Sequence, residues 1–139
     1  MQYPDTIGWS VYKARYLMRK RIQDKLKDCN ISSEQWSVLR SVSMEEGRNQ
    51  KALARMLLKD GATITRILNI LEDKKLVHRE NSPNDKREFL VYLTDKGHDL
   101  YINALKVVSQ NENEIESIFS EPELEQLKYL LNKLVSNVE

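Results

Sequence analysis

The chain has very little of the residues that cross-link or interrupt a small protein. Its 139 residues include one cysteine, three prolines and four glycines. The single cysteine, Cys29, excludes an internal disulfide and suits a reducing cytoplasm, where we expect the protein to act. No apolar run approaches the roughly 20 residues that cross a bilayer, and no signal peptide is evident. We therefore expect no membrane partner.

The same scarcity argues against a catalytic or metal centre. The glycines are scattered, so no glycine-rich loop is available to cradle a phosphate. Asp95, His98 and Asp99 share one helix end without a nucleophile beside them. Cys29, His78 and His98 lack the paired spacing of zinc ligands. We expect no enzyme, no metal site and no cofactor.

The whole chain has almost no excess of charge of one sign, but its segments do. The net charge of +1 argues by itself against a nucleic-acid-binding protein. However, residues 48–96 carry 11 Lys and Arg against 7 Asp and Glu, whereas residues 97–139 carry 3 against 8. A basic middle segment indicates a part that meets polyanions. Solvated helix faces of uneven sign are the alternative explanation.

Hydrophobic spacing and capping residues divide most of the chain into helices. A long helix is predicted from Asp5 to about Lys27. Ser32 opens a capping box for a second helix that ends near Gly47. Asn49 caps a third, short helix, and Asp60 caps a fourth over about 61–74. Two short helices joined by a brief turn predict a helix-turn-helix.

The pattern then alternates, which predicts a β-hairpin over about 77–93 with its turn at residues 82–85. A hairpin directly after a helix-turn-helix is a wing. Thr94 caps a fifth helix, and Pro122 fits the first turn of a last helix. That helix has an apolar seam suited to packing against a partner helix, formed by Leu124, Leu127, Leu131, Leu134 and Val138. The predicted fold class is mainly α with a small β-hairpin wing.

A winged helix-turn-helix reads duplex DNA by placing its fourth helix in the major groove. The residues of this recognition helix expected to contact DNA are Ala62, Thr63, Thr65, Arg66 and Asn69. In the wing they are Asp85, Lys86 and Arg87, with Asp85 orienting the Arg87 guanidinium toward a minor groove. The candidate phosphate contacts are Lys51, Arg55, Lys74, Lys75 and Arg79.

A ligand pocket is a further hypothesis. It would lie between the first two helices and the rest of the chain, and its expected lining is Trp9, Tyr12, Tyr16, Trp36 and Arg40. An aromatic stripe at helical spacing more often forms a core or a dimer interface than a ligand pocket. Arg40 suits a carboxylate ligand or an ordinary surface ion pair.

Six ordered strings of the sequence resemble the multiple-antibiotic-resistance regulator (MarR) family of bacterial transcription factors. They lie at residues 33–39, 50–54, 60–66, 71–79, 85–87 and 93–97. The resemblance implies a homodimer with an N-terminal dimerisation helix (1–31), a DNA-binding lobe (32–96) and C-terminal dimerisation helices (97–139). It also implies that Thr63, Thr65 and Arg66 contact palindromic DNA, with Arg87 and Asp85 acting as a wing pair.

The family commonly represses transcription and releases DNA when a small aromatic or lipophilic ligand, or a thiol oxidant, acts on it. Two positions depart from its pattern. Lys75 stands where the family usually has glycine, so this lysine is expected to adopt a positive φ or a different cap. Cys29 lies at the end of the first helix rather than near its start, where the peroxide-sensing branch has its cysteine, so we expect a plain buried or half-buried thiol.

The sequence therefore predicts a dimeric, ligand-responsive DNA-binding regulator, most readily a repressor of a palindromic operator. The main alternative is a winged-helix protein-interaction module that does not bind DNA. An enzyme with a pocket between two lobes is a third hypothesis without supporting residues.

Overall fold

Six α-helices, a short 3-10 helix and a small antiparallel sheet make up the computed structural model, which describes residues 2–139. In chain order the elements are α1 (Ile7–Lys25), η1 (Lys27–Cys29), α2 (Ser33–Met44), β1 (Arg48–Asn49), α3 (Gln50–Met56), α4 (Gly61–Asp73), β2 (Val77–Asn81), β3 (Phe89–Leu93), α5 (Asp95–Glu116) and α6 (Glu121–Val138). The predicted fold class, mainly α with a wing, is confirmed.

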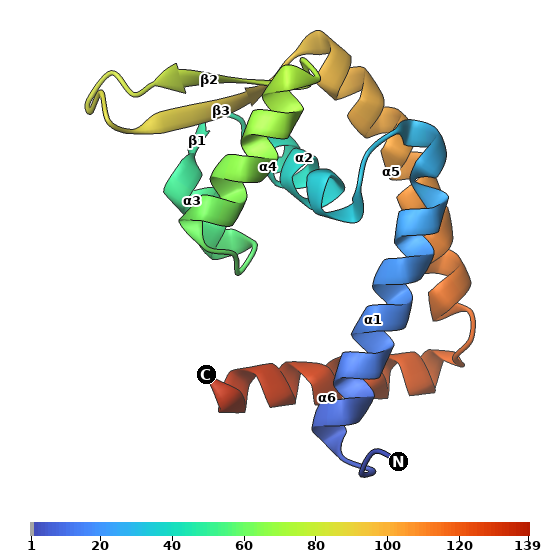
Figure 1. Ribbon diagram of the computed structural model, residues 1–139. Coiled ribbons are helices and arrows are strands. Elements are labelled where there is room, and N and C mark those ends of the chain that lie inside the picture. The colour runs from blue at the N-terminus through green and yellow to red at the C-terminus, as the bar shows by residue number, and fades with distance from the viewer. Residues whose placement is uncertain (1) are drawn as a thin grey trace.

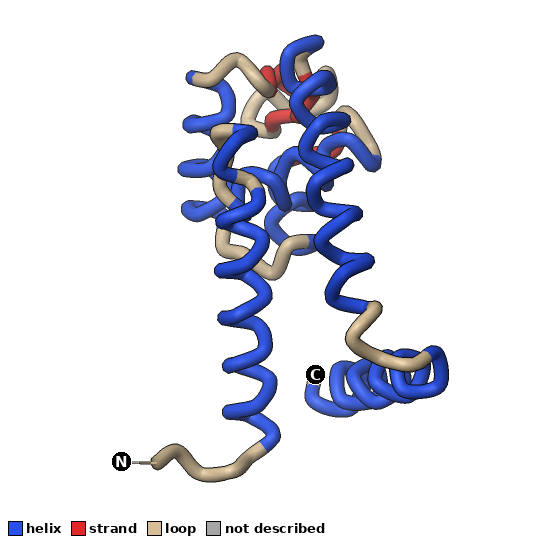
Figure 2. Tube along the Cα trace, turned by 90° about the vertical axis from the view of Figure 1, so that its right-hand side faces the viewer, coloured by secondary structure: helices blue, strands red, loops and turns tan. Residues whose placement is uncertain are grey.

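The elements form one lobe with long helices running away from it. The lobe contains α2, α3, α4 and the sheet, and the β2–β3 hairpin projects from it (Figure 1). The helices α1 and α5 pack against each other, and the N-terminal half of α1 extends past the lobe. Figure 2 shows α6 standing apart from α1, at the far end of α5.

The core lies where α2, α4, α5 and the sheet meet. Leu39 of α2, Leu68 of α4, Val77 of β2 and Val91 of β3 are almost completely buried, as is Ala104 of α5. Each large side chain buried in this way stabilises the lobe by roughly 1.5–3 kcal/mol relative to an exposed one. The core therefore fixes α4 and the wing to the same rigid body.

The predicted caps of the second to fifth helices are confirmed, whereas the first helix starts at Ile7 behind Thr6 rather than at Asp5. Ser32 accepts a hydrogen bond from the Gln35 N–H, and the Gln35 side chain accepts one from the Ser32 N–H. Asn49 and Thr94 cap α3 and α5 by accepting backbone N–H groups three residues ahead. Such caps satisfy donors that a helix leaves unpaired at its start, so boundaries there are a local property of the sequence.

Two features differ from the expected elements. The first helix ends at Lys25 and is followed by the 3-10 turn η1, so it is shorter than expected. A third strand, β1, pairs antiparallel with β3 in the order β1-β3-β2, with Arg48 opposite Val91. Two residues are too few to carry an alternating pattern, which is why the sequence predicted only a hairpin.

Lys75 and Cys29 are the two residues that depart from the family pattern in the sequence. Lys75 has a φ of +62° and ends α4 in the left-handed region, as expected from its position. Cys29 is half-buried against the core, as expected, and burial raises the pKa of its thiol.

Among the helices of residues 2–139, none combines the length and apolarity that crossing a membrane requires.

Candidate nucleic-acid interface

The helix α4 presents one polar face to solvent. Ile64, Ile67, Leu68 and Leu71 point into the core, so the opposite face is exposed. Four of the five predicted recognition residues lie exposed on that face, at Ala62, Thr65, Arg66 and Asn69, whereas Thr63 is half-buried. Their spacing of three and four residues lines them up along the helix.

The N-terminus of α4 already holds a carboxylate. Asp60 accepts a hydrogen bond from the Thr63 N–H at 2.7 Å, and this bond is the main reason that the pKa of Asp60 is lowered. The carboxylate complements the positive end of the helix dipole. A DNA phosphate at this terminus therefore meets Asp60 as a competitor, so we expect positive side chains to be the main phosphate ligands.

The hydroxyl of Thr65 is held by two neighbours. It donates to the Gly61 carbonyl at 2.9 Å and accepts from Nε2 of Gln50, the first residue of α3, at 2.8 Å. Oε1 of Gln50 is buried and has no partner among the described residues. Gln50 could not be identified from the sequence, since its link to Thr65 spans the turn between α3 and α4.

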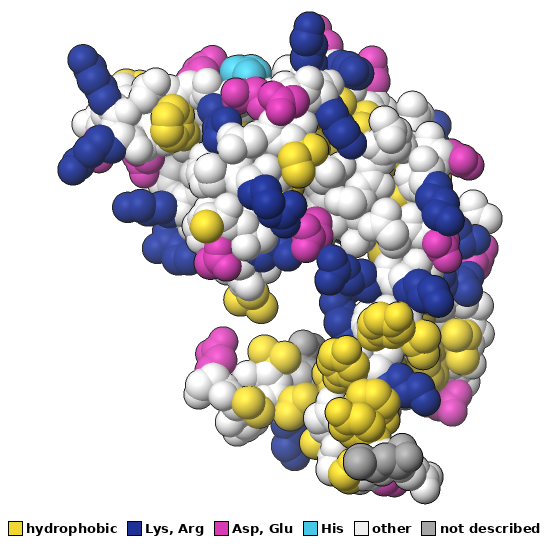
Figure 3. Space-filling model, in the orientation of Figure 1, with side chains coloured by type: hydrophobic (Ala, Val, Ile, Leu, Met, Phe, Trp, Pro, Cys, Tyr) yellow, Lys and Arg dark blue, Asp and Glu magenta, His cyan; other side chains and the backbone are white. Residues whose placement is uncertain are grey.

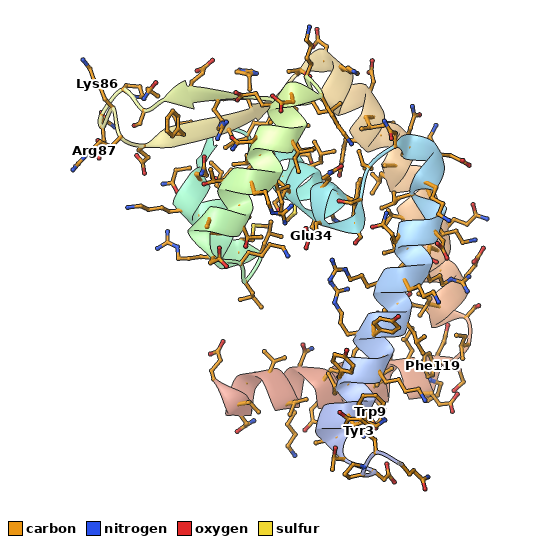
Figure 4. All side chains as sticks on the ribbon, in the orientation of Figure 1. Tyr3, Trp9, Glu34, Lys86, Arg87 and Phe119 are labelled. Atoms are coloured by element: carbon orange, nitrogen blue, oxygen red, sulfur yellow. The ribbon has the colours of Figure 1, made fainter. Side chains whose placement is uncertain are left out.

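Arg66 does not extend freely from the helix. Its guanidinium donates to Oε2 of Glu34 at 3.1 Å, and Glu34 lies at the start of α2 on the side of the lobe that faces α1 (Figure 4). Arg66 nevertheless keeps 57% of its side chain exposed. Glu34 could not be predicted from the sequence, because its partners come from distant segments.

The wing carries its charges at the tip. Nε and the backbone N–H of Arg87 donate to Oδ1 of Asp85 at 3.2 and 2.9 Å, so the predicted pair is present. The hydrogen bond from Arg87 is also the main reason that the pKa of Asp85 is lowered. Arg87 stays 91% exposed, and Lys86 beside it is exposed as well (Figure 4). Figure 3 shows Lys and Arg side chains gathered at this end of the molecule.

The five candidate phosphate ligands fall into two groups. Lys51 and Arg55 on α3 and Lys75 after α4 are exposed. The Lys74 ammonium instead donates to the Asn30 carbonyl at 2.8 Å and to the side chain of Gln35, which ties α4 to the loop before α2. Arg79 is also engaged within the lobe.

Arg79 of β2 is 17% exposed and bridges the hairpin to α4. It donates to Glu72 at 3.0 Å and to Oδ1 of Asn69 at 2.7 Å, and its guanidinium lies 5.9 Å from the centre of the Phe89 ring. An arginine with these partners braces the wing against the recognition helix. The Asn69 amide is oriented by the same contact.

The structure places the predicted pocket residues in three different surroundings. Tyr12 and Tyr16 stack along the exposed outer half of α1. Trp36 is buried against Tyr101 and lines one cavity, whereas Arg40 borders a different depression on α5. The reason is that Tyr12 and Tyr16 lie on the N-terminal part of α1, which extends past the lobe.

A cavity of about 400 Å³ lies instead between α1, α2, the end of α3 and α5. Its walls include Met18, Ile22, Trp36 and Leu57, with arginine, lysine and glutamate side chains at its rim. Within residues 2–139, no three side chains of metal-binding type lie close enough to hold an ion.

Residues 31–89 match the model of the MarR family. The transcriptional regulator HosA of Escherichia coli O111:H- is 29% identical over 116 residues, which are 84% of this chain and 84% of that protein. The S. aureus MepR–DNA complex has a TM-score of 0.91 at 28% identity, covering 97% of this chain and 100% of that one. A mutant MarR from E. coli complexed with operator DNA has a TM-score of 0.87 at 28% identity, covering 92% of each chain.

The similarity extends well beyond the lobe. The matches to MepR and MarR include nearly all of the chain, and so take in the long flanking helices. The family model covers the part of the chain from the loop before α2 into β3. The resemblance noted in the sequence is therefore confirmed: residues 31–89 match the MarR family model, and the chain is similar over nearly its whole length to MepR and MarR in their DNA complexes.

Proposed function

We propose that this protein is a homodimeric DNA-binding regulator that reads duplex DNA with α4 and the wing. The observation that carries the proposal is the joining of α3, α4 and the hairpin into one polar surface. Gln50 of α3 bonds Thr65 of α4, and Asn49 bonds Glu88 beside β3 at 2.7 Å. A surface braced in this way can enter a major groove while its wing reaches the next minor groove.

Affinity and specificity would come from different groups. Exposed cations at Lys51, Arg55, Lys75 and Lys86 are placed to neutralise phosphates, which gives affinity that falls with salt. The exposed side chains of α4 would contact base edges. Arg87, aligned by Asp85, would enter the minor groove where narrow A·T tracts concentrate negative potential.

Dimerisation is supported by apolar surface on the helices outside the lobe. Trp9, Tyr12 and Tyr16 stack along α1, and Tyr3, which precedes the helix, stacks on Trp9. Among the described residues, α6 has no buried side chain, and Leu130 and Leu131 are 48% and 43% exposed. Figure 3 shows this apolar surface concentrated on α1 and α6. Contiguous apolar patches of this kind mark interfaces in soluble proteins.

Dimerisation and DNA binding would be carried out by different segments of the chain. Residues 1–31 and 97–139 would form the dimer, and residues 32–96 would bind DNA. The two recognition helices of the dimer would then sit about 34–36 Å apart to match successive major grooves.

We further propose that the regulator is a repressor of a palindromic operator. A small aromatic or lipophilic ligand in the cavity beside Trp36 would change this spacing and release the DNA.

Replacing Arg87 with alanine tests the wing. We expect the affinity for duplex DNA to fall by about 1–3 kcal/mol, because one charge-assisted DNA contact is lost. The dimer should persist, since the wing tip is far from α1 and α6 (Figure 1). Fluorescence anisotropy at moderate salt measures the affinity, and size-exclusion chromatography measures the dimer.

Lys106→Ala provides the matched control, because Lys106 is exposed on α5 and its removal changes the net charge equally. The control should bind DNA almost as tightly as the unmodified protein. Equal affinity for the Arg87 and Lys106 variants would show that the wing has no special role.

A further inference from the structure

Glu34 is the meeting point of three cations from three different elements. Its Oε1 lies 3.2 Å from a guanidinium nitrogen of Arg19 on α1 and 3.9 Å from Nζ of Lys59 in the loop before α4. Its Oε2 accepts from Arg66 of the recognition helix at 3.1 Å. The carboxylate is 27% exposed, so it is less hydrated than an ordinary surface glutamate.

This arrangement keeps Glu34 charged and in place. The hydrogen bond from Arg66 is the main cause that lowers the pKa of Glu34, and Lys59 and Arg19 add to it. Glu34 is also in the first turn of α2, where the helix dipole favours a negative charge. At neutral pH Arg66 therefore always faces a fixed carboxylate.

A DNA phosphate offers Arg66 the same kind of partner. Guanidinium groups bind carboxylates and phosphates through equivalent charge-assisted hydrogen bonds. Arg66 is 57% exposed on the face of α4 that also carries Ala62, Thr65 and Asn69. The contact to Glu34 uses one guanidinium nitrogen of Arg66 and draws the side chain toward α2. A DNA ligand that needs this nitrogen, or needs the side chain to extend away from α2, therefore competes with the internal pair.

We propose that Glu34 competes with DNA for the Arg66 side chain. By binding Arg66 in the free protein, Glu34 lowers the affinity of the recognition helix for duplex DNA. The inference rests on the proposed function, since it requires that α4 binds DNA. It assigns Glu34 a role in setting affinity although Glu34 itself makes no DNA contact. Reciprocally, DNA that captures Arg66 leaves Glu34 to Arg19 and Lys59 alone.

The test is the variant Glu34→Gln, measured by anisotropy with a short duplex of random sequence over a range of salt concentrations. We expect affinity to rise by about two- to five-fold, the range that corresponds to releasing one exposed ion pair. We expect the slope of log affinity against log salt to steepen by up to about 0.9, because one more phosphate is neutralised. Since glutamine is nearly isosteric and the site is at the surface, the variant should fold, and Glu34→Ala should change affinity in the same direction.

A double-mutant cycle separates this competition from a general change of charge. In the Arg66→Gln background, Glu34→Gln should leave affinity almost unchanged. Glu45→Gln removes the same charge from another ion pair of the lobe, with Arg48, and should also have little effect. The inference is overturned if Glu34→Gln leaves affinity unchanged or weakens it, if its effect persists without Arg66, or if Glu45→Gln matches it. Failure of the unmodified protein to bind duplex at all would instead overturn the proposed function.

Discussion

Replacing Gly97 with alanine is expected to destabilise the protein by about 3 kcal/mol or more, the upper end of what overpacking costs. Gly97 is buried in the first turn of α5, against the connection between α4 and β2. A Cβ atom there would lie 1.9 Å from the Leu76 carbonyl oxygen and 2.8 Å from its carbonyl carbon. Both are backbone atoms, so relief requires α5 to move away from the lobe.

Chemical denaturation of the Gly97→Ala variant measures this cost as a lower midpoint. Gly8→Ala is the matched control, because a Cβ at Gly8 meets nothing within 4 Å in the first turns of α1. That control should be neutral or more stable, by up to about 1 kcal/mol, since glycine is a poor helix residue. Equal midpoints for the two variants would mean that α5 does not approach Leu76 so closely.

Replacing Leu131 with aspartate is expected to convert the dimer to a monomer and to weaken DNA binding by about 100-fold or more. Leu131 lies on the apolar seam of α6 and is 43% exposed in the single chain. A charge there cannot be buried against a partner helix without a large penalty. Losing the second DNA-binding lobe removes the avidity of two linked sites, which is typically worth about 10²–10⁴ in affinity.

Light scattering after size-exclusion chromatography reports the mass, and anisotropy reports the DNA affinity. Ser136→Asp adds the same charge on the other side of α6, where Ser136 is exposed. It should remain dimeric and bind DNA nearly as well as the unmodified protein. If the Leu131→Asp and Ser136→Asp variants both have the mass of a dimer, the dimer interface is misassigned.

Local features of the fold were predictable from the sequence. The caps at Ser32, Asn49, Asp60 and Thr94 each involve residues within three positions of one another, so their signal is contained in a short string. The positive φ of Lys75 was one of two outcomes expected from the resemblance, because the MarR family usually has glycine at this position. The polar face of α4 followed from its helical period alone.

The features that were missed depend on distant segments. Glu34 receives cations from α1, from the loop before α4 and from α4 itself, and no spacing in the sequence signals this meeting. The expected phosphate ligand Arg79 instead braces the wing through Glu72 and Asn69. The surroundings of the aromatic pocket residues could not be predicted from the sequence, because a shared helical stripe says nothing about how far a helix extends beyond the lobe.

Selection of bound sequences from a pool of random duplexes tests the central claim most directly. The account predicts an enriched inverted repeat whose half-sites are centred about one helical turn, 10–10.5 base pairs, apart, with binding that weakens steeply as salt rises. This result would show DNA binding, two-fold symmetry and the spacing of the two α4 helices in one experiment. No enrichment together with no salt-dependent association would contradict the account and favour a protein-interaction module.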